Sequence, residues 1–387
     1  MPLSAQTRRL LTLALADVAA APALADAIDG IEAAAAAAGT AAGAAQADAT
    51  AALTAVRASL PCYGDGHHGA VEFIDNIFVL TSPIEATTIV IDSSWLKAAN
   101  GGPNGLVLRA TESITIRGGC YFTGMGNNGE DANGITPGGL NPGYQGLGAG
   151  GARNGSAGGA VTEGAGEPGV SQHDVSNMGG WSSPGNPFPN WNEAQPQPGG
   201  NGGTTGLGDN PVSGGQAEGQ CLPIDIMDWL MGRGSNGIPL GAGGCGGAGG
   251  NCDGIGVAGA GAQGGGGGSP VLMAAPRIIY EAGAAIERDV TGGSGGRGGD
   301  AVGGNCGGGG GGAAGNCSGI FDLTESLEVG AEVSVTDRYY PYESRAQGGA
   351  NGNGSGDTGT TGASGSNGLS GRTYLINPIT MQFTNRD

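Results

Sequence analysis

The sequence is poor in the side chains that usually build a hydrophobic core or a charged binding surface. Aromatic residues make up 5% of its 387 residues and charged residues 13%, and Lys97 is its one lysine. Fifteen basic residues stand against 34 acidic ones, which gives a formal net charge of −19 at pH 7. Nucleic acids and anionic membranes are bound by clustered Lys and Arg, so this balance argues against both partners. The sequence also lacks an apolar run of about 18 residues, so we expect no membrane insertion.

Glycine is what the sequence has instead, with 87 residues. A chain so poor in large apolar side chains cannot close an ordinary hydrophobic core over most of its length. It also lacks the charge and the Pro, Ser and Lys enrichment of a typical disordered chain. We therefore expect an ordered structure that does not depend on an apolar core.

Many of these glycines recur at every third residue. The strictest run is Gly356, Gly359, Gly362, Gly365, Gly368 and Gly371, and residues 292–300 repeat the period as triplets. A polyglycine II helix has three residues per turn, so glycine at every third position leaves one edge bare. Such helices can pack at backbone distance and exchange hydrogen bonds, which predicts a bundle without an apolar core. A flexible Gly/Ser linker is the alternative.

Residues 5–60 form an Ala-rich segment that favours a helix, and Pro61 ends it. From Leu24 to Val56 the apolar positions follow a 4-3 spacing, as in a coiled-coil seam. A stripe made mostly of Ala buries too little surface for a lone helix, so we expect self-association as a parallel homotrimer. A solvated linker helix is one alternative. A cleaved secretory signal is another, although Asp17 interrupts its apolar run.

Short β-branched runs follow from Gly69 and are typical of strands: 'AVEFIDNIFVL', 'TTIVIDSSWL', 'GLVLRA' and 'ESITIRG'. Residues 107–116 match residues 320–329 through Thr-Glu-Ser followed by apolar-x-apolar, and residues 271–280 are a looser third copy. Each copy precedes a glycine-rich tract. Repeats of this kind usually stack and cover one another's apolar faces.

These patterns predict a mixed fold, with an N-terminal Ala-rich coiled-coil helix, short β-strand repeats and a polyglycine II helix bundle in a trimeric fibre. We expect a helical attachment and trimerisation arm at 1–62, a β-strand shaft at 63–125 and a glycine-rich domain at 126–387, with strand repeats near 271–290 and 320–336. The seven cysteines permit up to three disulfides with one thiol left over, and their spacings fit no zinc module.

The strand region from Thr87 to Gly129, with tracts such as 'GGGGGSPVLMAAPRIIYEAGAAI', resembles the glycine-rich tail-fibre and receptor-binding proteins of tailed bacteriophages. The resemblance covers about residues 70–387. It implies a trimeric fibre of the virion tail, with an N-terminal anchor to tail or baseplate proteins, here residues 1–62, and a distal C-terminal adhesin. In some phage adhesins of this kind, glycine tracts form polyglycine II helices and bind with the loops at their ends.

Three segments break the glycine pattern and gather aromatic residues: 167–198, 221–240 and 337–345. Aromatic rings beside Asn, Asp and Arg suit sugars, because a ring packs on the C–H face of a pyranose while polar groups bond its hydroxyls. The alternative is that such rings plug local cores, which we favour for 'IDIMDWLM' in the second segment. The predicted receptor-binding residues are Trp181, Phe188, Trp191, Tyr339, Tyr340 and Tyr342.

The sequence gives little support for catalysis. It has no Gly-x-Ser-x-Gly, His-Glu-x-x-His or P-loop motif. We interpret His67-His68 as a turn with solvent-facing imidazoles rather than a metal site. Residues 295–303 fit the calcium nonapeptide pattern, but calcium rolls need tandem copies. We therefore predict no enzyme activity, no cofactor and no bound metal.

The sequence thus predicts a phage tail fibre or distal adhesin that binds a bacterial surface glycan or outer-membrane protein. A structural glycine-rich secreted or cell-surface protein is the first alternative. A capsule-degrading tail enzyme is the second, and it would need a pair of carboxylates in a groove.

Overall fold

The structure is a computed structural model. It describes residues 21–59, 61–99, 105–139, 161–162, 165–168, 179–180, 199–205, 207, 209–214, 222–223, 243–253, 256–340, 359–380 and 382–386. The chain divides into two compact units, Met1–Leu60 and Pro61–Asp387, and we describe each by itself.

The first unit contains the helix α2, Ala21–Ser59. Ala has the highest helix propensity of all residues, which explains why so long a segment is helical. The side chains described between Asp29 and Ala52 are almost all exposed, and Ile31 is 68% exposed. Nowhere in the described residues is a helix both long and apolar enough to cross a membrane.

The second unit contains the 3-10 helix η1 (Pro61–Tyr63) and all of the described strands. In chain order these are β1 (Ala70–Ile74), β2 (Ile77–Leu80), β3 (Ile84–Asp92), β4 (Trp95–Ala98), β5 (Leu106–Arg117), β6 (Gly119–Thr123), β7 (Val161–Thr162), β8 (Ala165–Gly166), β9 (Gly179–Gly180), β10 (Leu222–Pro223), β11 (Val271–Ala274), β12 (Arg277–Tyr280), β13 (Ala285–Asp289), β14 (Ile320–Leu323), β15 (Ser326–Val329), β16 (Ser334–Arg338), β17 (Thr373–Asn377) and β18 (Gln382–Asn385).

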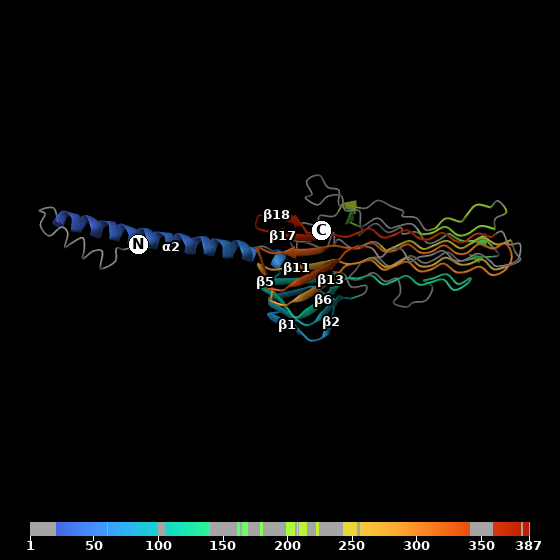
Figure 1. The fold of residues 1–387 in the computed structure, drawn as a ribbon, viewed down its shortest axis with the longest axis horizontal. Helices are drawn as coiled ribbons and strands as arrows, with labels where there is room; N and C mark the ends of the chain where they lie inside the picture. Colours follow the sequence, from blue (N-terminus) through green and yellow to red (C-terminus); the bar gives the residue numbers. More distant parts are fainter. Residues whose placement is uncertain are drawn as a thin grey trace. The chain divides into compact units, whose positions relative to one another are not determined.

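The longer strands wind into a β-solenoid, in which each turn of the chain repeats the path of the turn before it (Figure 1). Strands at corresponding places in successive turns pair in parallel. Within the described residues, β2, β4, β6, β13 and β16 make a five-stranded sheet, and the other long strands make a nine-stranded one. The chain turns between these two sheets at single residues with left-handed backbone, namely Asp75, Ser93, Gly118, Gly283 and Glu332.

The predicted sequence repeat corresponds to this stacking, with one shift in register. Arg277 pairs with Ser113, as the aligned repeats predict. Val271, however, pairs with Leu106 rather than with Val107. β5 therefore contains one residue more than the turn that follows it, and the pairing of β3 with β5 is irregular at the same place. Such a bulge inserts an extra residue without interrupting the rest of the ladder.

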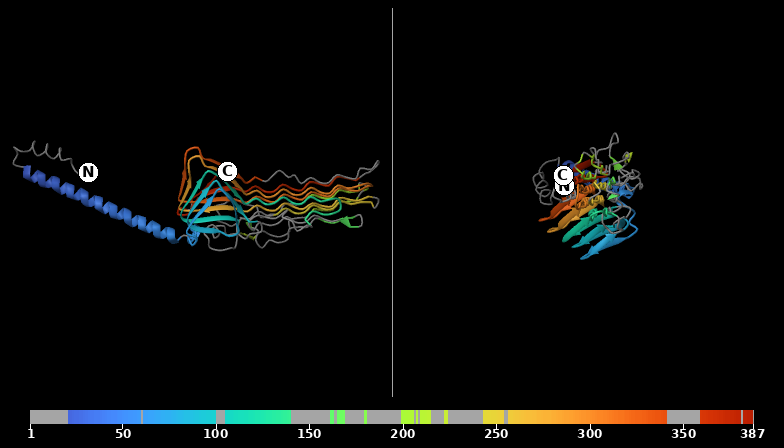
Figure 2. Two further views of the ribbon diagram at one scale, coloured as in Figure 1. Left: turned by 90° about the horizontal axis from the view of Figure 1, so that it is seen from below. Right: turned by 90° about the vertical axis from the view of Figure 1, so that its right-hand side faces the viewer.

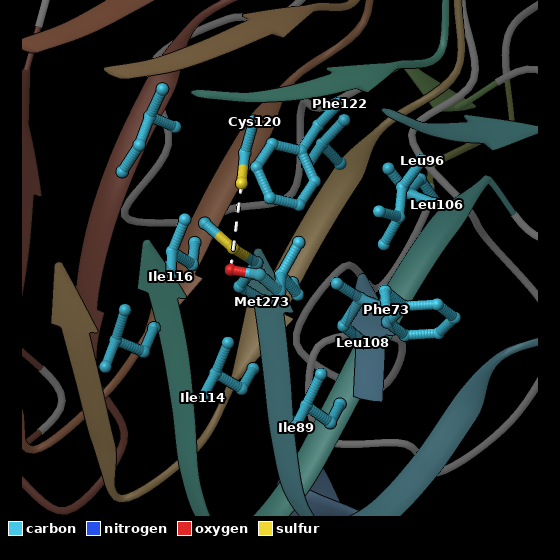
Figure 3. Packing of buried hydrophobic residues seen from close by; sticks show 14 of the residues in the cluster. Phe73, Ile89, Leu96, Leu106, Leu108, Ile114, Ile116, Cys120, Phe122 and Met273 are labelled. Carbon is cyan, nitrogen blue, oxygen red and sulfur yellow. Dashed lines mark hydrogen bonds between the residues drawn. The ribbon is translucent and has the colours of Figure 1, made fainter. Parts of the chain in front are cut away.

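The interior of the solenoid is an ordinary apolar core built from these ladders. Ile89, Ile114 and Ile278 follow one another in register from turn to turn, and all three are fully buried. Figure 3 shows Leu96 and Phe122 of the five-stranded sheet among the side chains that fill the same interior. Fully burying one such side chain is worth about 1.5–3 kcal/mol, so these few strands hold most of the apolar stabilisation of a glycine-rich chain.

The glycine-rich segments are insertions at one corner of the solenoid. They follow β6, β13 and β16 and lead back into β11, β14 and β17, and Figure 2 shows them running side by side away from the sheets. The ladder of hydrogen bonds continues into them with the same register. Val271 donates its N–H to the carbonyl of Gly319 at 3.1 Å, and three residues earlier Gly268 donates to Asn316 at 2.9 Å. The sheets therefore set the register of the glycine segments.

Residues 306–319 lie at the centre of these segments. The N–H groups of Gly307, Gly308 and Gly309 donate in turn to residues 251, 360 and 299, on three different neighbours, and the next three N–H groups repeat that order with residues 248, 363 and 296. The whole segment is buried. Neighbouring segments approach residues 307–312 at backbone distance on three sides, which leaves no room for side chains. This explains why all six of these residues are glycine.

The predicted fold class is wrong as a description of this molecule. The described chain is mostly β-sheet, and α2 is its one described α-helix, so the predicted mixed fold of a coiled-coil helix, short β-strand repeats and a polyglycine II bundle does not represent it. The Ala-rich segment misled the prediction because a run of Ala satisfies any heptad register. The strands of the predicted shaft, 63–125, and the strand repeats predicted near 271–290 and 320–336 are successive turns of one solenoid.

Candidate functional site

The described glycine segments share an end that, along the hydrogen-bond ladder, is remote from the sheets. We call it the distal end and define it by residues 131–136, 203–205, 207, 209, 251–253, 256–259 and 297–307. Two contacts show that these residues lie at one level. Ala260 donates its N–H to Gly134 at 2.7 Å, and Gly259 donates to Gly307 at 3.1 Å. Asn251 lies beside Gly307, to which its carbonyl is bonded at 2.7 Å, and the Asn251 N–H donates to Gly203 at 3.0 Å.

A disulfide crosslinks the distal end. Cys252 and Cys306 join the segment 243–253 to the central segment, and Asn305 donates to the carboxylate of Asp253 at 2.7 Å beside this bond. Val257 and Val302 form an antiparallel bridge next to it. Turns that would otherwise fray are thus held by a covalent bond and by backbone pairing.

Exposed aliphatic side chains gather at these turns. Ile135 is 55% exposed, Val257 44%, and Leu207 and Val302 67% each. In the described residues of the glycine segments, the other exposed large apolar side chains are Met125 and Tyr340, each within two residues of the end of β6 or β16, so the concentration at the distal turns calls for an explanation. Exposed apolar residues that cluster on a soluble protein commonly mark a binding surface.

The distal end also carries acidic groups. Asp209 accepts hydrogen bonds from the Thr205 hydroxyl at 2.5 Å and from the Asn251 side chain at 2.8 Å. Burial acts to raise the pKa of Asp209, but these hydrogen bonds outweigh it and lower the pKa. Asp300 pairs with Arg297 at 2.7 Å. The distal end therefore combines exposed aliphatic side chains with acidic groups.

The predicted aromatic site is only partly within the described residues. Trp181, Phe188, Trp191 and Tyr342 lie outside them. Tyr340 is 64% exposed, whereas Tyr339 is 8% exposed and packs with the core of the solenoid, its ring centroid 4.6 Å from that of Tyr340. Tyr340 remains a predicted binding residue, and Tyr339 fits the alternative of a ring that fills a core.

The histidine turn brings three groups with metal-ligand chemistry together. Ligand atoms of Asp65, His67 and Glu85 lie within 4.8 Å of one another. They already bond within the turn, since His67 Nδ1 lies 2.5 Å from Asp65 Oδ1 and the Asp65 N–H donates to Glu85 at 3.2 Å. The hydrogen bond from His67 lowers the pKa of Asp65. We interpret these contacts as the bonds that shape an exposed turn.

A second surface, which the sequence did not single out, lies on the solenoid. Trp95 and Tyr121 are neighbours across β4 and β6 on the outer face of the five-stranded sheet, and their rings meet at 64° with centroids 5.4 Å apart. They line a hollow of about 500 Å³ together with Glu287 of β13 and Thr336 of β16. These four residues lie on four strands that are far apart in sequence. They come together because the strands pair in register and each turns these residues to the outer face of the sheet.

The chain was compared with known proteins, and no family model, curated protein or solved structure matches it.

Proposed function

We propose that the chain is a non-enzymatic adhesin of a tailed bacteriophage, which attaches the virion to a receptor on the bacterial surface through the distal end of its glycine segments. The observation that carries the proposal is the gathering of exposed Ile135, Leu207, Val257 and Val302 at turns that a disulfide and backbone pairing hold in place. The assignment to a phage virion and to a bacterial host is based on the resemblance of the strand and glycine tracts to tail-fibre proteins.

The build of the second unit supports a display role. The solenoid concentrates the apolar core, and the hydrogen-bond ladder carries its register into the segments up to Gly259 and Gly307. Exposed distal side chains such as Leu207 and Val302 can therefore vary without changing the glycines that pack the backbone, as a receptor-binding surface requires. The aliphatic side chains and the acidic groups of the distal end favour an outer-membrane protein over a glycan as the partner of this end.

The Cys252–Cys306 disulfide supports an extracellular location, because disulfides persist in oxidising surroundings. A structural surface protein would also be extracellular, so only receptor binding distinguishes it from an adhesin. For a capsule-degrading enzyme, the hollow on the solenoid offers one carboxylate, Glu287, among its described lining residues, whereas glycoside cleavage uses two.

The test uses the fluorescently labelled full-length chain and flow cytometry on a panel of bacterial strains. We expect binding to at least one strain. We expect the variant Leu207→Asp/Val302→Asp to lose this binding, because it replaces two exposed aliphatic side chains of the distal end with carboxylates. Val329→Asp is the matched control, since Val329 is 57% exposed but lies on β15 of the solenoid. Immunogold labelling of the tail tip of purified virions tests the assignment to a phage.

Two outcomes would contradict the proposal. If no strain binds the chain, or if the distal and control variants bind equally well, the distal end is not the receptor surface. If strains bind but virions carry no label, the protein is a secreted or cell-surface adhesin instead.

A further inference from the structure

We propose that the hollow on the outer face of the five-stranded sheet is a second binding site, and that its ligand is an uncharged pyranose-based glycan. This site lies on the solenoid and does not depend on the receptor site proposed for the distal end.

The hollow is produced by rows of residues in register across the strands. One row runs from Trp95 through Tyr121 and Glu287 to Thr336 and forms its raised side. The adjacent row is Gly119, Ala285 and Ser334, whose small side chains form the floor. A Cβ added at Gly119 would meet nothing within 4 Å, so the space above this glycine is open.

The two aromatic rings present their faces and edges to this space. Trp95 is 53% exposed, an unusual state for so large an apolar side chain, and Tyr121 stands against it at 64°. A sugar ring packs its C–H face on such rings. The volume of about 500 Å³ is within the range of small-ligand sites, roughly 300–1,000 Å³.

Tyr121 is held in place before any ligand arrives. Its hydroxyl donates to Asp289 at 3.3 Å, and Asp289 itself accepts from the hydroxyl and the N–H of Thr291 at 2.7 and 3.0 Å. Burial, together with the charge of Asp289, raises the pKa of Tyr121 to about 12, so the phenol keeps its proton. A ring that is fixed in this way loses little conformational entropy on binding.

Polar groups at the hollow suit sugar hydroxyls. The Glu287 carboxylate accepts hydrogen bonds, and the hydroxyls of Ser334 and Thr336 donate or accept. The described lining residues include no Lys, Arg or His for an anionic sugar, and Arg338, which lies outside this lining, is paired with Glu287 at 2.8 Å. Together with a net charge of −19, this favours an uncharged glycan.

The experiment measures binding of the full-length chain to a glycan array that carries neutral α- and β-linked pyranose oligosaccharides and purified bacterial surface polysaccharides. We expect at least one neutral glycan to bind and Trp95→Ala to weaken its Kd roughly ten-fold. Gly119→Leu should abolish binding by filling the hollow, and its Cβ would meet no atom within 4 Å. Val329→Ala is the matched control, since it truncates an exposed apolar side chain on β15 of the other sheet and should leave the Kd unchanged.

Several results would overturn the proposal. They are an array on which no glycan binds, equal affinity of the wild type and the Gly119→Leu variant, and binding confined to anionic polysaccharides. Self-association that Trp95→Ala disrupts, without glycan binding, would instead identify this face as a contact between two copies of the chain. The distal variant Leu207→Asp/Val302→Asp should retain glycan binding, so the failure of one proposal is distinguishable from the failure of the other.

Discussion

The guanidinium of Arg288 and the carboxylate of Asp322 lie 2.7 Å apart inside the solenoid, and neither side chain reaches solvent. Arg288 also donates two hydrogen bonds to Asp337 at 2.7 Å. The Tyr280 hydroxyl donates to Asp322 at 3.4 Å, and Arg386 near the C-terminus approaches Asp322 at the same distance. One buried cation thus joins β13, β14 and β16, and its charge is balanced within the core.

Replacing Arg288 by Met should destabilise the protein by roughly 3–5 kcal/mol, because two carboxylates would then be left in the core without their main partner. Arg277→Met is the matched control. Arg277 forms a two-bonded pair with Glu328 on the surface, and such pairs contribute about 0–1 kcal/mol. Urea unfolding followed by circular dichroism measures both variants, and equal losses would show that the buried network is not a stability determinant.

The sequence allowed parts of this fold to be predicted because glycine periodicity is a local signal. Glycine at every third position between Gly359 and Gly371 predicted side-by-side segments, and Gly362 and Gly365 do abut neighbouring carbonyls. The short strands and their repeat were also visible. The pairing of Leu106 with Val271 was not, since 153 residues (118–270) lie between the two strands and nothing local encodes their register.

The candidate sites were harder to predict for the same reason. The exposed aliphatic residues Leu207 and Val302 are single residues in polar stretches, and only the position of the turns gives them a common location. Trp95 and Tyr121 belong to strands that looked like ordinary core strands. Both rings point outward because the solenoid buries the opposite face of each strand. The sequence of a short apolar run does not show which of its two faces will be buried.

The stability of the protein should fall as the pH rises above about 9. Burial raises the pKa of the Cys62 thiol from 9.0 to about 11, although the nearby charge of Arg109 opposes the shift. A thiol whose pKa is higher in the folded state contributes stability that is complete below the unfolded pKa and is lost as the pH rises to the folded one. Two pKa units correspond to about 2–3 kcal/mol.

Urea unfolding at about pH 8 and at about pH 11 checks this expectation. Tyr121, with a folded pKa of about 12, adds a loss of the same sign above the ordinary tyrosine pKa of 10.0. The variant Cys62→Ala should show a smaller difference between the two pH values, whatever its stability at neutral pH. A variant whose pH dependence equals that of the wild type would mean that Cys62 is not the group responsible.

Replacing glycines at the packed edge of residues 359–371 should destabilise the protein much more than replacing their neighbours. A Cβ at Gly362 would lie 2.0 Å from the carbonyl oxygen of Gly309, and one at Gly365 would lie 2.1 Å from that of Gly312. The segments would have to separate, which would strain the hydrogen bond that Gly311 donates to Ala363 at 2.9 Å.

We expect Gly362→Ala and Gly365→Ala to cost roughly 1–3 kcal/mol each, as overpacked cores do. Thr361→Ala and Ser364→Ala are matched controls in the same segment, because both side chains are exposed, and each should change stability by about 0.5 kcal/mol or less. Thermal unfolding of the full chain measures all four variants. Equal tolerance at the two pairs of positions would mean that this segment behaves as a linker and that the lateral hydrogen bonds do not stabilise it, since only a packed backbone distinguishes every third residue from its neighbours.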